Sequence, residues 1–282
     1  LRTFGLDSDC RAFFRIGIIR GRQARLGPRA GKERFVMGQN GLHGLIGVAV
    51  ARVTSKEAPE PGRAIAAKSF AYGFVTGNVL PDIDLAALAV TYLFDSKLAM
   101  RMHRTATHSL VVVGLVTLLG VLLSTTRGGK SYFKGLGAGM ALHTLVDIFL
   151  WFSGVDILWP LGSFGVRSEI NLWTNVKLPP LWNNLLGSTD FLMMALFYGL
   201  LIKLSRQYET NVGFLRRLAA FRAFHYISFL VYLVLSFFLT RTLFDIAQYA
   251  VIVLVSLPMT WITIQGSKPT LERLGLASVG YR

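Results

Sequence analysis

The stretch from Gly77 to Ser109 gathers two carboxylates, two histidines and an arginine at the edge of long apolar runs. These residues are Asp82, Asp84, His103, Arg104 and His108. Ionisable side chains in such surroundings are costly unless they have partners or a function. Imidazole nitrogens and carboxylate oxygens together are typical ligands of zinc, manganese or iron. The stretch therefore predicts a metal site.

The two carboxylates belong to the segment LPDID. Asp82 and Asp84 are two residues apart, so in an extended segment both side chains would point the same way. Pro81 favours that geometry, because a proline biases the residue before it away from the helical region. We therefore expect both carboxylates on one side of an extended segment.

The two histidines follow in HRTATHS. His103 and His108 are five residues apart, which on a single helix would place them about 140° out of register. They converge only if the turn between them is irregular or if His108 opens the next helix. Thr107 or Ser109 would suit the cap of that helix, because a hydroxyl can accept a hydrogen bond from a free backbone N–H.

A third group lies in GLGAGMALHTLVD, where four positions follow at steps of four: Gly135, Gly139, His143 and Asp147. This spacing places two ligand-type side chains and two small residues on one helical face. Small residues let a neighbouring membrane helix approach closely. Gly73 and Gly77, just before LPDID, offer a matching surface. The spacing predicts a close contact between these two helices.

The candidate ligands outnumber what one metal needs. They are His43, which opens a further apolar stretch, with Asp82, Asp84, His103, His108, His143 and Asp147. One zinc usually takes three protein ligands and a water, so this set means either two metals or one metal with supporting groups. A site with an open position lowers the pKa of bound water toward 7 and supplies a hydroxide nucleophile. Arg104 would either clamp a phosphate or carboxylate of the substrate or pair with Asp82 or Asp84.

These motifs together resemble the membrane-bound metal-dependent hydrolase family, also known as LexA-binding inner-membrane hydrolases. The resemblance rests on a histidine at the start of an apolar helix, LPDxD, HRxxTHS, a helical HxxxD and a following WPL, from His43 to Leu161. It implies a polytopic inner-membrane protein with a divalent-metal site and a hydrolytic activity. We expect a metal, zinc rather than manganese or iron, on Asp82, Asp84, His108, His143 and Asp147. His43 or His103 would complete the shell, and His103 and Arg104 are the candidate catalytic residues.

Composition independently indicates a membrane protein. Hydrophobic residues make up 52% of the 282 residues, charged residues 16%, and the mean hydropathy is +0.49, whereas globular chains average about 25% charged. We predict an all-α, polytopic transmembrane bundle of about six to seven helices, with a short half-helix or interfacial segment at residues 85 to 94. Three parts follow: a basic arm over 1–35, a hydrolase-like core over 36–165, and an interfacial loop with additional transmembrane helices over 166–282.

The net charge of +15 needs no nucleic-acid partner, because Lys and Arg collect in loops on the non-translocated side of a membrane. The basic arm indicates anionic lipid, although arginine-rich beginnings are also typical of organellar targeting. We expect the inner membrane of an organelle, mitochondrion rather than plastid, or that of a bacterium. Cys10, the single cysteine, excludes an intrachain disulfide and a cysteine metal cluster.

The loop charges and the positions of the candidate ligands predict different membrane sides for the N-terminal arm. The candidate ligands fall opposite the basic loops, on a face with Trp159, Trp173 and Trp182, which suit a membrane interface. His43 joins them only if the basic arm lies on that less basic face. If the protein is active, we expect a polar cavity to open at the face of Trp159 and Trp173.

Two functions remain open. The first is a metal-dependent hydrolase that acts on a phosphate ester or headgroup-like substrate at the membrane surface. The second is a non-catalytic accessory or scaffold subunit of a larger inner-membrane complex. The retained motifs favour the first, whereas the basic arm and the helices after Asp190 add surface without adding ligand-type residues. His225 and Asp245 are expected to stabilise the bundle by hydrogen bonding.

Overall fold

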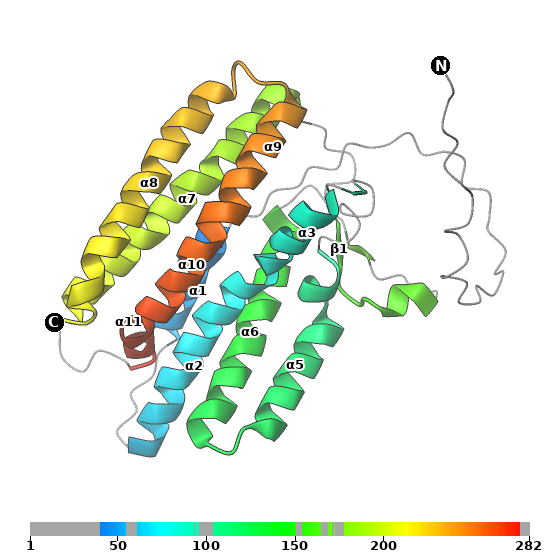
Figure 1. The fold of residues 1–282 in the computed structure, drawn as a ribbon. Coiled ribbons are helices and arrows are strands. Elements are labelled where there is room, and N and C mark those ends of the chain that lie inside the picture. Colours follow the sequence, from blue (N-terminus) through cyan, green and yellow to red (C-terminus); the bar gives the residue numbers. More distant parts are fainter. Residues whose placement is uncertain are drawn as a thin grey trace, which may run out of the picture. The chain divides into compact units, whose positions relative to one another are not determined.

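A computed structural model describes residues 40–54, 61–92, 94–95, 104–150, 154–164, 169–170, 172 and 178–276. By its contacts, the chain from Arg34 to Arg282 is one compact unit. His103, Trp173 and the predicted basic arm lie outside the described residues. The described part is a bundle of helices that run up and down beside one another (Figure 1).

The described residues form ten α-helices in the following order. They are α1 (Asn40–Val53), α2 (Pro61–Val79), α3 (Asp84–Tyr92), α5 (Leu110–Leu123), α6 (Arg127–Leu150), α7 (Pro180–Gln207), α8 (Leu215–Leu235), α9 (Arg241–Val251), α10 (Leu257–Gly266) and α11 (Lys268–Leu274). A 3-10 turn, Leu80–Ile83, joins α2 to α3, and a π-helical turn, Ile252–Ser256, joins α9 to α10. Two short strands, β1 (Val155–Asp156) and β2 (Glu169–Ile170), pair antiparallel.

The helical membrane fold expected from the sequence is confirmed, but the expected number of helices is too low. Among the described residues, five helical stretches are long and apolar enough to cross a membrane. Counted as continuous stretches, the described helices number eight rather than six to seven. The difference arises because α11 is too short and polar to be recognised as a further apolar segment. The predicted short segment after LPDID is α3, with 9 residues.

Two helices are too short to cross the bundle, and this positions the candidate ligands. The helices α1 and α5 have 14 residues each, or about 21 Å, against a hydrocarbon core of about 30 Å. The start of α1 lies against the middle of α7, because Gly41 contacts the backbones of Met193 and Met194. His43 in α1 and His108 just before α5 therefore enter the interior of the bundle rather than its rim.

The helices α2 and α6 are in backbone contact through glycines, as the sequence predicted. A Cβ on Gly77 would overlap the carbonyl of Leu136, and one on Gly139 would overlap the carbonyl of Phe74. Gly73 and Gly135 meet the facing backbone in the same way. The contacts advance together along both helices, so α2 and α6 run parallel, with α5 beside them (Figure 1).

On the other side of the bundle, hydroxyl groups line the buried face of α10 and α11 that packs against α7. Thr260, Thr263, Ser267 and Thr270 are all buried. Thr270 is the centre of the group: Asn211 Nδ2 donates to its Oγ1 at 2.7 Å, and the hydroxyls of Ser205 and Thr210 lie at 2.8 Å. Small polar residues of this kind hold membrane helices together through close packing and hydrogen bonds.

His225 and Asp245 have the structural role expected of them. The Nδ1–H of His225 donates to the Phe221 carbonyl at 2.8 Å, so its Nε2 accepts from Ser256 Oγ at 3.0 Å. Asp245 pairs with Arg241 at 2.7 Å. Both contacts join neighbouring turns or helices and involve no candidate ligand.

We predict that Gly139→Leu disrupts the bundle and that Gly114→Leu does not. The side chain added at Gly139 meets backbone atoms of α2, which cannot move aside, whereas nothing lies within 4 Å of a Cβ at Gly114. Gly120→Leu should be intermediate, because the obstacle there is the ring of Phe133. The recovery of monodisperse protein in size-exclusion chromatography measures the effect, and equal recovery of all three variants would contradict the contact.

We predict that Thr270→Val lowers the free energy of unfolding by about 1–3 kcal/mol, because it leaves buried donors and acceptors without a partner. Thr54→Val is the control, since its hydroxyl bonds only to a carbonyl of its own helix at an exposed position. Denaturant unfolding in detergent measures both variants. A Thr270→Val protein as stable as the Thr54→Val protein would show that the hydroxyl cluster contributes nothing.

Candidate metal centre

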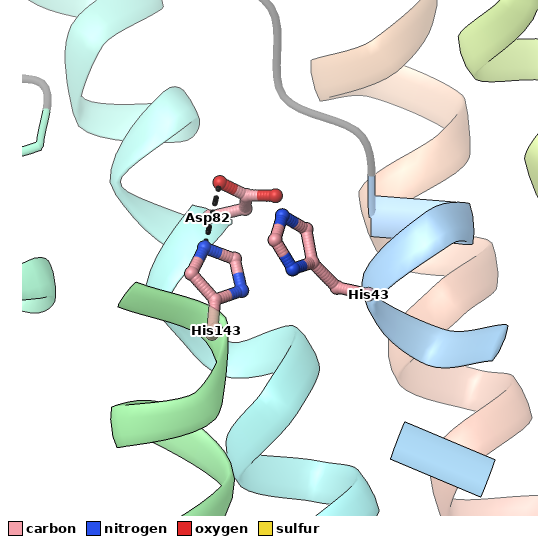
Figure 2. Close-up of side chains that lie close together, drawn as sticks. All are labelled: His43, Asp82 and His143. Atoms are coloured by element: carbon pink, nitrogen blue, oxygen red, sulfur yellow. Dashed lines mark ion pairs between the residues drawn. The ribbon is translucent and has the colours of Figure 1, made fainter. Parts of the chain in front are cut away.

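Five candidate ligands that are distant in sequence converge inside the bundle. They are His43 from α1, Asp82 from the 3-10 turn, His108 from the turn before α5, and His143 and Asp147 from α6. Each of these side chains is at most 2% exposed. Figure 2 shows the carboxylate of Asp82 above the rings of His43 and His143. The predicted convergence is confirmed, and binding of a metal stays a prediction.

Five distances of 3.1 to 3.8 Å connect four ligand atoms. His143 Nε2 lies 3.1 Å from His108 Nε2 and 3.5 Å from Asp82 Oδ1. His108 Nε2 lies 3.8 Å from Asp82 Oδ1 and 3.3 Å from Asp147 Oδ2, which is 3.8 Å from His143 Nε2. Four ligands about 2.1 Å from a zinc ion at tetrahedral angles lie about 3.4 Å from one another. The five distances are therefore close to those around one tetrahedral metal ion.

His43 lies against this group from the side of α1. Its ring stacks on that of His143, with centroids 3.6 Å apart, and its Nε2 lies 3.1 Å from Asp147 Oδ1. Two sets of three residues bring ligand atoms within 4.8 Å of one another: His43, Asp82 and His143, and His108, His143 and Asp147. Both sets need His143, so they describe one site.

LPDID positions His143 through the backbone as well as through Asp82. Pro81 has no N–H, and the chain turns there from α2 into a 3-10 turn whose hydrogen bonds reach back only three residues. The carbonyl of Asn78 is then available, and it accepts from His143 Nδ1 at 2.9 Å. With its proton on Nδ1, His143 presents a bare Nε2 toward the other ligands. Metal-binding histidines usually have a second hydrogen bond of this kind.

The expectation that Asp82 and Asp84 point the same way is wrong. The segment is a 3-10 turn leading into α3 rather than extended, and two residues apart on a helix are on nearly opposite faces. Asp82 and Asp84 instead lie on either side of His108. Asp82 Oδ1 is 3.8 Å from its Nε2, and Asp84 Oδ2 is 3.7 Å from its Nδ1.

Arg104 pairs with a different carboxylate from those expected. Its Nε lies 3.2 Å from Asp147 Oδ2, and its backbone N–H donates to Asp84 Oδ2 at 3.2 Å. Asp147 lies 43 residues further along the chain, and nothing in the sequence indicates the pairing. Arg104 has a φ of 60°, so the turn before His108 is irregular; the expected convergence of His103 with His108 lies outside the described residues.

Ser109 is the N-terminal cap expected for α5, and it also forms a hydrogen bond with the WPL segment. Its side chain accepts from Val111 N at 3.2 Å and donates to the Trp159 carbonyl at 2.6 Å. The Thr144 hydroxyl lies 3.1 Å from the His108 carbonyl. Asn78, Ser109 and Thr144 thus fix the backbone around the histidines. A polar residue four positions before Asp82 in an apolar helix was the signal that sequence reasoning missed for Asn78.

The charges of the described site also suit a divalent cation. Three carboxylates, Asp82, Asp84 and Asp147, face one guanidinium, that of Arg104, which leaves a formal charge of −2 when the histidines are neutral. The neutral imidazole is the form that ligates metals. A buried net charge is costly. Asp82 Oδ2 and His43 Nδ1 are buried and make no hydrogen bond within the described part of the chain.

One family model matches a range of the chain that includes every residue of the described site. Residues 39–243 match the family described as YdjM inner membrane protein, which is more than half of the chain. No curated protein and no solved structure matches the chain. The match begins at the end of the basic arm and runs beyond Leu161, where the motifs end. It supports the inner-membrane part of the resemblance, and hydrolase activity stays a prediction.

We predict that the purified protein binds about one zinc ion per chain and that His143→Ala reduces bound zinc to background, because both ligand sets need this side chain. His225→Ala is the matched control, since it removes a buried histidine that bonds only to Phe221 and Ser256 in the described structure. Elemental mass spectrometry after zinc loading and desalting gives the stoichiometry. Equal zinc in the two variants would exclude His143 as a ligand.

Proposed function

The chain belongs to the YdjM inner membrane protein family, and we propose that it is a divalent-metal-dependent hydrolase. Its substrate would be a phosphate ester or similar headgroup-like group at the membrane surface. The observation that carries the proposal is the closeness of His108, His143, Asp82 and Asp147, whose ligand atoms are connected by distances of 3.1 to 3.8 Å inside an apolar bundle. An inner membrane of an organelle and one of a bacterium both fit the family.

We assign the metal to these four side chains, and zinc suits their two nitrogens and two oxygens. One metal is favoured over two. The Nδ1 of His143 donates to the Asn78 carbonyl, so only Nε2 is left for a metal, and both sets of ligands share it. Asp84 belongs to neither set within the described residues. It contacts the Nδ1 side of His108 instead.

A bound metal would supply a hydroxide nucleophile by lowering the pKa of a coordinated water. His43 is placed to accept a proton in this reaction. Its Nε2 lies 3.1 Å from Asp147 Oδ1, and neither ring nitrogen makes a hydrogen bond with the described residues, so a lone pair of the neutral ring is available. A carboxylate next to a histidine is a common arrangement for a general base.

Arg104 would hold the anionic group of the substrate. A guanidinium presents several donors in a planar fork, and Nε of Arg104 lies 3.2 Å from Asp147 Oδ2. A phosphate that bound this guanidinium would lie next to the ligands. His103 lies outside the described residues, and its catalytic role stays a prediction.

The orientation of the site relative to charge supports a substrate on the less basic face. Lys130, Lys134 and Arg127 lie in the first half of α6, whereas His143 and Asp147 lie near its end. Arg206, Arg216 and Arg217 lie where α7 ends and α8 begins, away from the start of α7. Positive loops stay on the non-translocated side, so the cluster lies toward the translocated side. The basic end would contact anionic lipid headgroups.

The second candidate, an accessory subunit without catalysis, is favoured by the closure of the site. The ligands and Arg104 are at most 2% exposed, and Arg104 already has a carboxylate partner in Asp147. A scaffold needs no path for water, and such pairs could simply stabilise a subunit within a larger membrane complex. The predicted polar cavity at the Trp159 face would separate the two functions.

We predict that zinc-loaded protein in anionic phospholipid vesicles hydrolyses a phosphate monoester probe, and that His43→Ala lowers kcat about 100-fold, the usual contribution of a general base. His43→Ala should keep at least half of the bound zinc, because His43 is outside the four-ligand group. His225→Ala is again the control and should keep full activity. Full zinc occupancy without hydrolysis of any ester probe would favour the accessory subunit.

A further inference from the structure

The ring of His108 is contacted by polar groups at both nitrogens, and the two sides differ. Its Nε2 faces His143, Asp82 and Asp147. Its Nδ1 faces the Thr107 hydroxyl at 3.0 Å and, beyond it, Asp84 Oδ2 at 3.7 Å. The side of Nε2 is the proposed metal site, so the side of Nδ1 decides which nitrogen carries the proton.

The hydrogen bonds on the Nδ1 side allow only one direction. An ionised carboxylate only accepts, so the Thr107 hydroxyl donates its proton to Asp84 Oδ2 at 2.9 Å. The Thr107 oxygen then has lone pairs left and no proton, so it accepts from the neighbouring ring nitrogen. The proton of His108 is therefore on Nδ1, and Nε2 is bare. A bare Nε2 is the form that can bind a metal.

We infer that Asp84 and Thr107 are positioning residues that fix the tautomer and the ring orientation of His108, and that Asp84 is not itself a metal ligand. This inference rests on the proposed function, because it assigns His108 to a metal. His143 is fixed in the same way by a different group, the Asn78 carbonyl. The Nε2 atoms of His108 and His143 lie 3.1 Å apart, and each ring is fixed by a hydrogen bond at its Nδ1.

The simpler alternative is that Asp84 only stabilises the turn before α5. Its Oδ2 also accepts from the backbone N–H of Arg104 at 3.2 Å, and Arg104 has a φ of 60°, which is uncommon for a residue with a side chain. A turn cap would act on stability with or without metal. A positioning pair acts on metal affinity, and the hydroxyl of Thr107 is needed for it.

The test compares the zinc affinity of the full chain in detergent for Asp84→Asn, Thr107→Val, Thr107→Ser and the wild type, by competition with a fluorescent chelator. Loss of groups that orient metal ligands usually weakens binding about 10- to 100-fold. We expect that loss for Asp84→Asn and Thr107→Val, whereas Thr107→Ser, which keeps the hydroxyl, should lie within about threefold of the wild type. All four proteins should still bind one zinc at saturation, because the ligands are intact.

Each alternative gives a different pattern. Weaker binding by Asp84→Asn with normal affinity for Thr107→Val would make Asp84 a ligand and overturn the inference. Normal affinity for both would overturn it while leaving the proposed function intact, whereas a wild type that binds no zinc would overturn both. Thermal unfolding without zinc identifies a turn cap: midpoints for Asp84→Asn and Thr107→Val that fall as far without zinc as with it would also overturn the inference.

Discussion

The backbone contact between α2 and α6 sets the register of the site. Gly77 and Gly139 allow the two helices to touch at the level where α2 ends. Directly beyond this level, Asn78 at the end of α2 and Asp82 in the 3-10 turn meet His143 on α6. A side chain at either glycine would separate the axes by several ångströms, and hydrogen-bond and ligand distances tolerate only tenths of an ångström. The glycines are therefore as necessary to the site as its ligands.

Given that register, Pro81 determines what the end of α2 can do. A continuing α-helix would use the Asn78 carbonyl for its own ladder and leave nothing to hold His143. By interrupting the ladder, Pro81 makes the carbonyl available, and the turn that follows directs Asp82 inward. The side chain of Asn78 also donates to the His43 carbonyl, so this residue connects three helices around one point.

The sequence predicted which residues form the site better than it predicted which of them contact one another. The apolar runs, the glycine spacing and the convergence of His43, Asp82, His108, His143 and Asp147 all follow from local patterns and the cost of burying ionisable groups. The partner of Arg104 does not, because it depends on where α6 ends relative to a turn 40 residues away. The direction of Asp84 was wrong for a local reason, since Pro81 allows both an extended segment and the first turn of a new helix.

Arg104 connects the two sides of the site at a cost. Its φ of 60° is strained for a residue other than glycine, by about 1–3 kcal/mol. A glycine would adopt it freely, so the arginine is there for its side chain or its charge. Its N–H binds the carboxylate behind His108, and its Nε binds a carboxylate in front of it. Because one residue bridges Asp84 and Asp147, an anion that drew the guanidinium away from Asp147 would free that oxygen for a metal. The ion pair that closes the site in the second candidate function is thus the same contact that would couple substrate binding to the metal in the first.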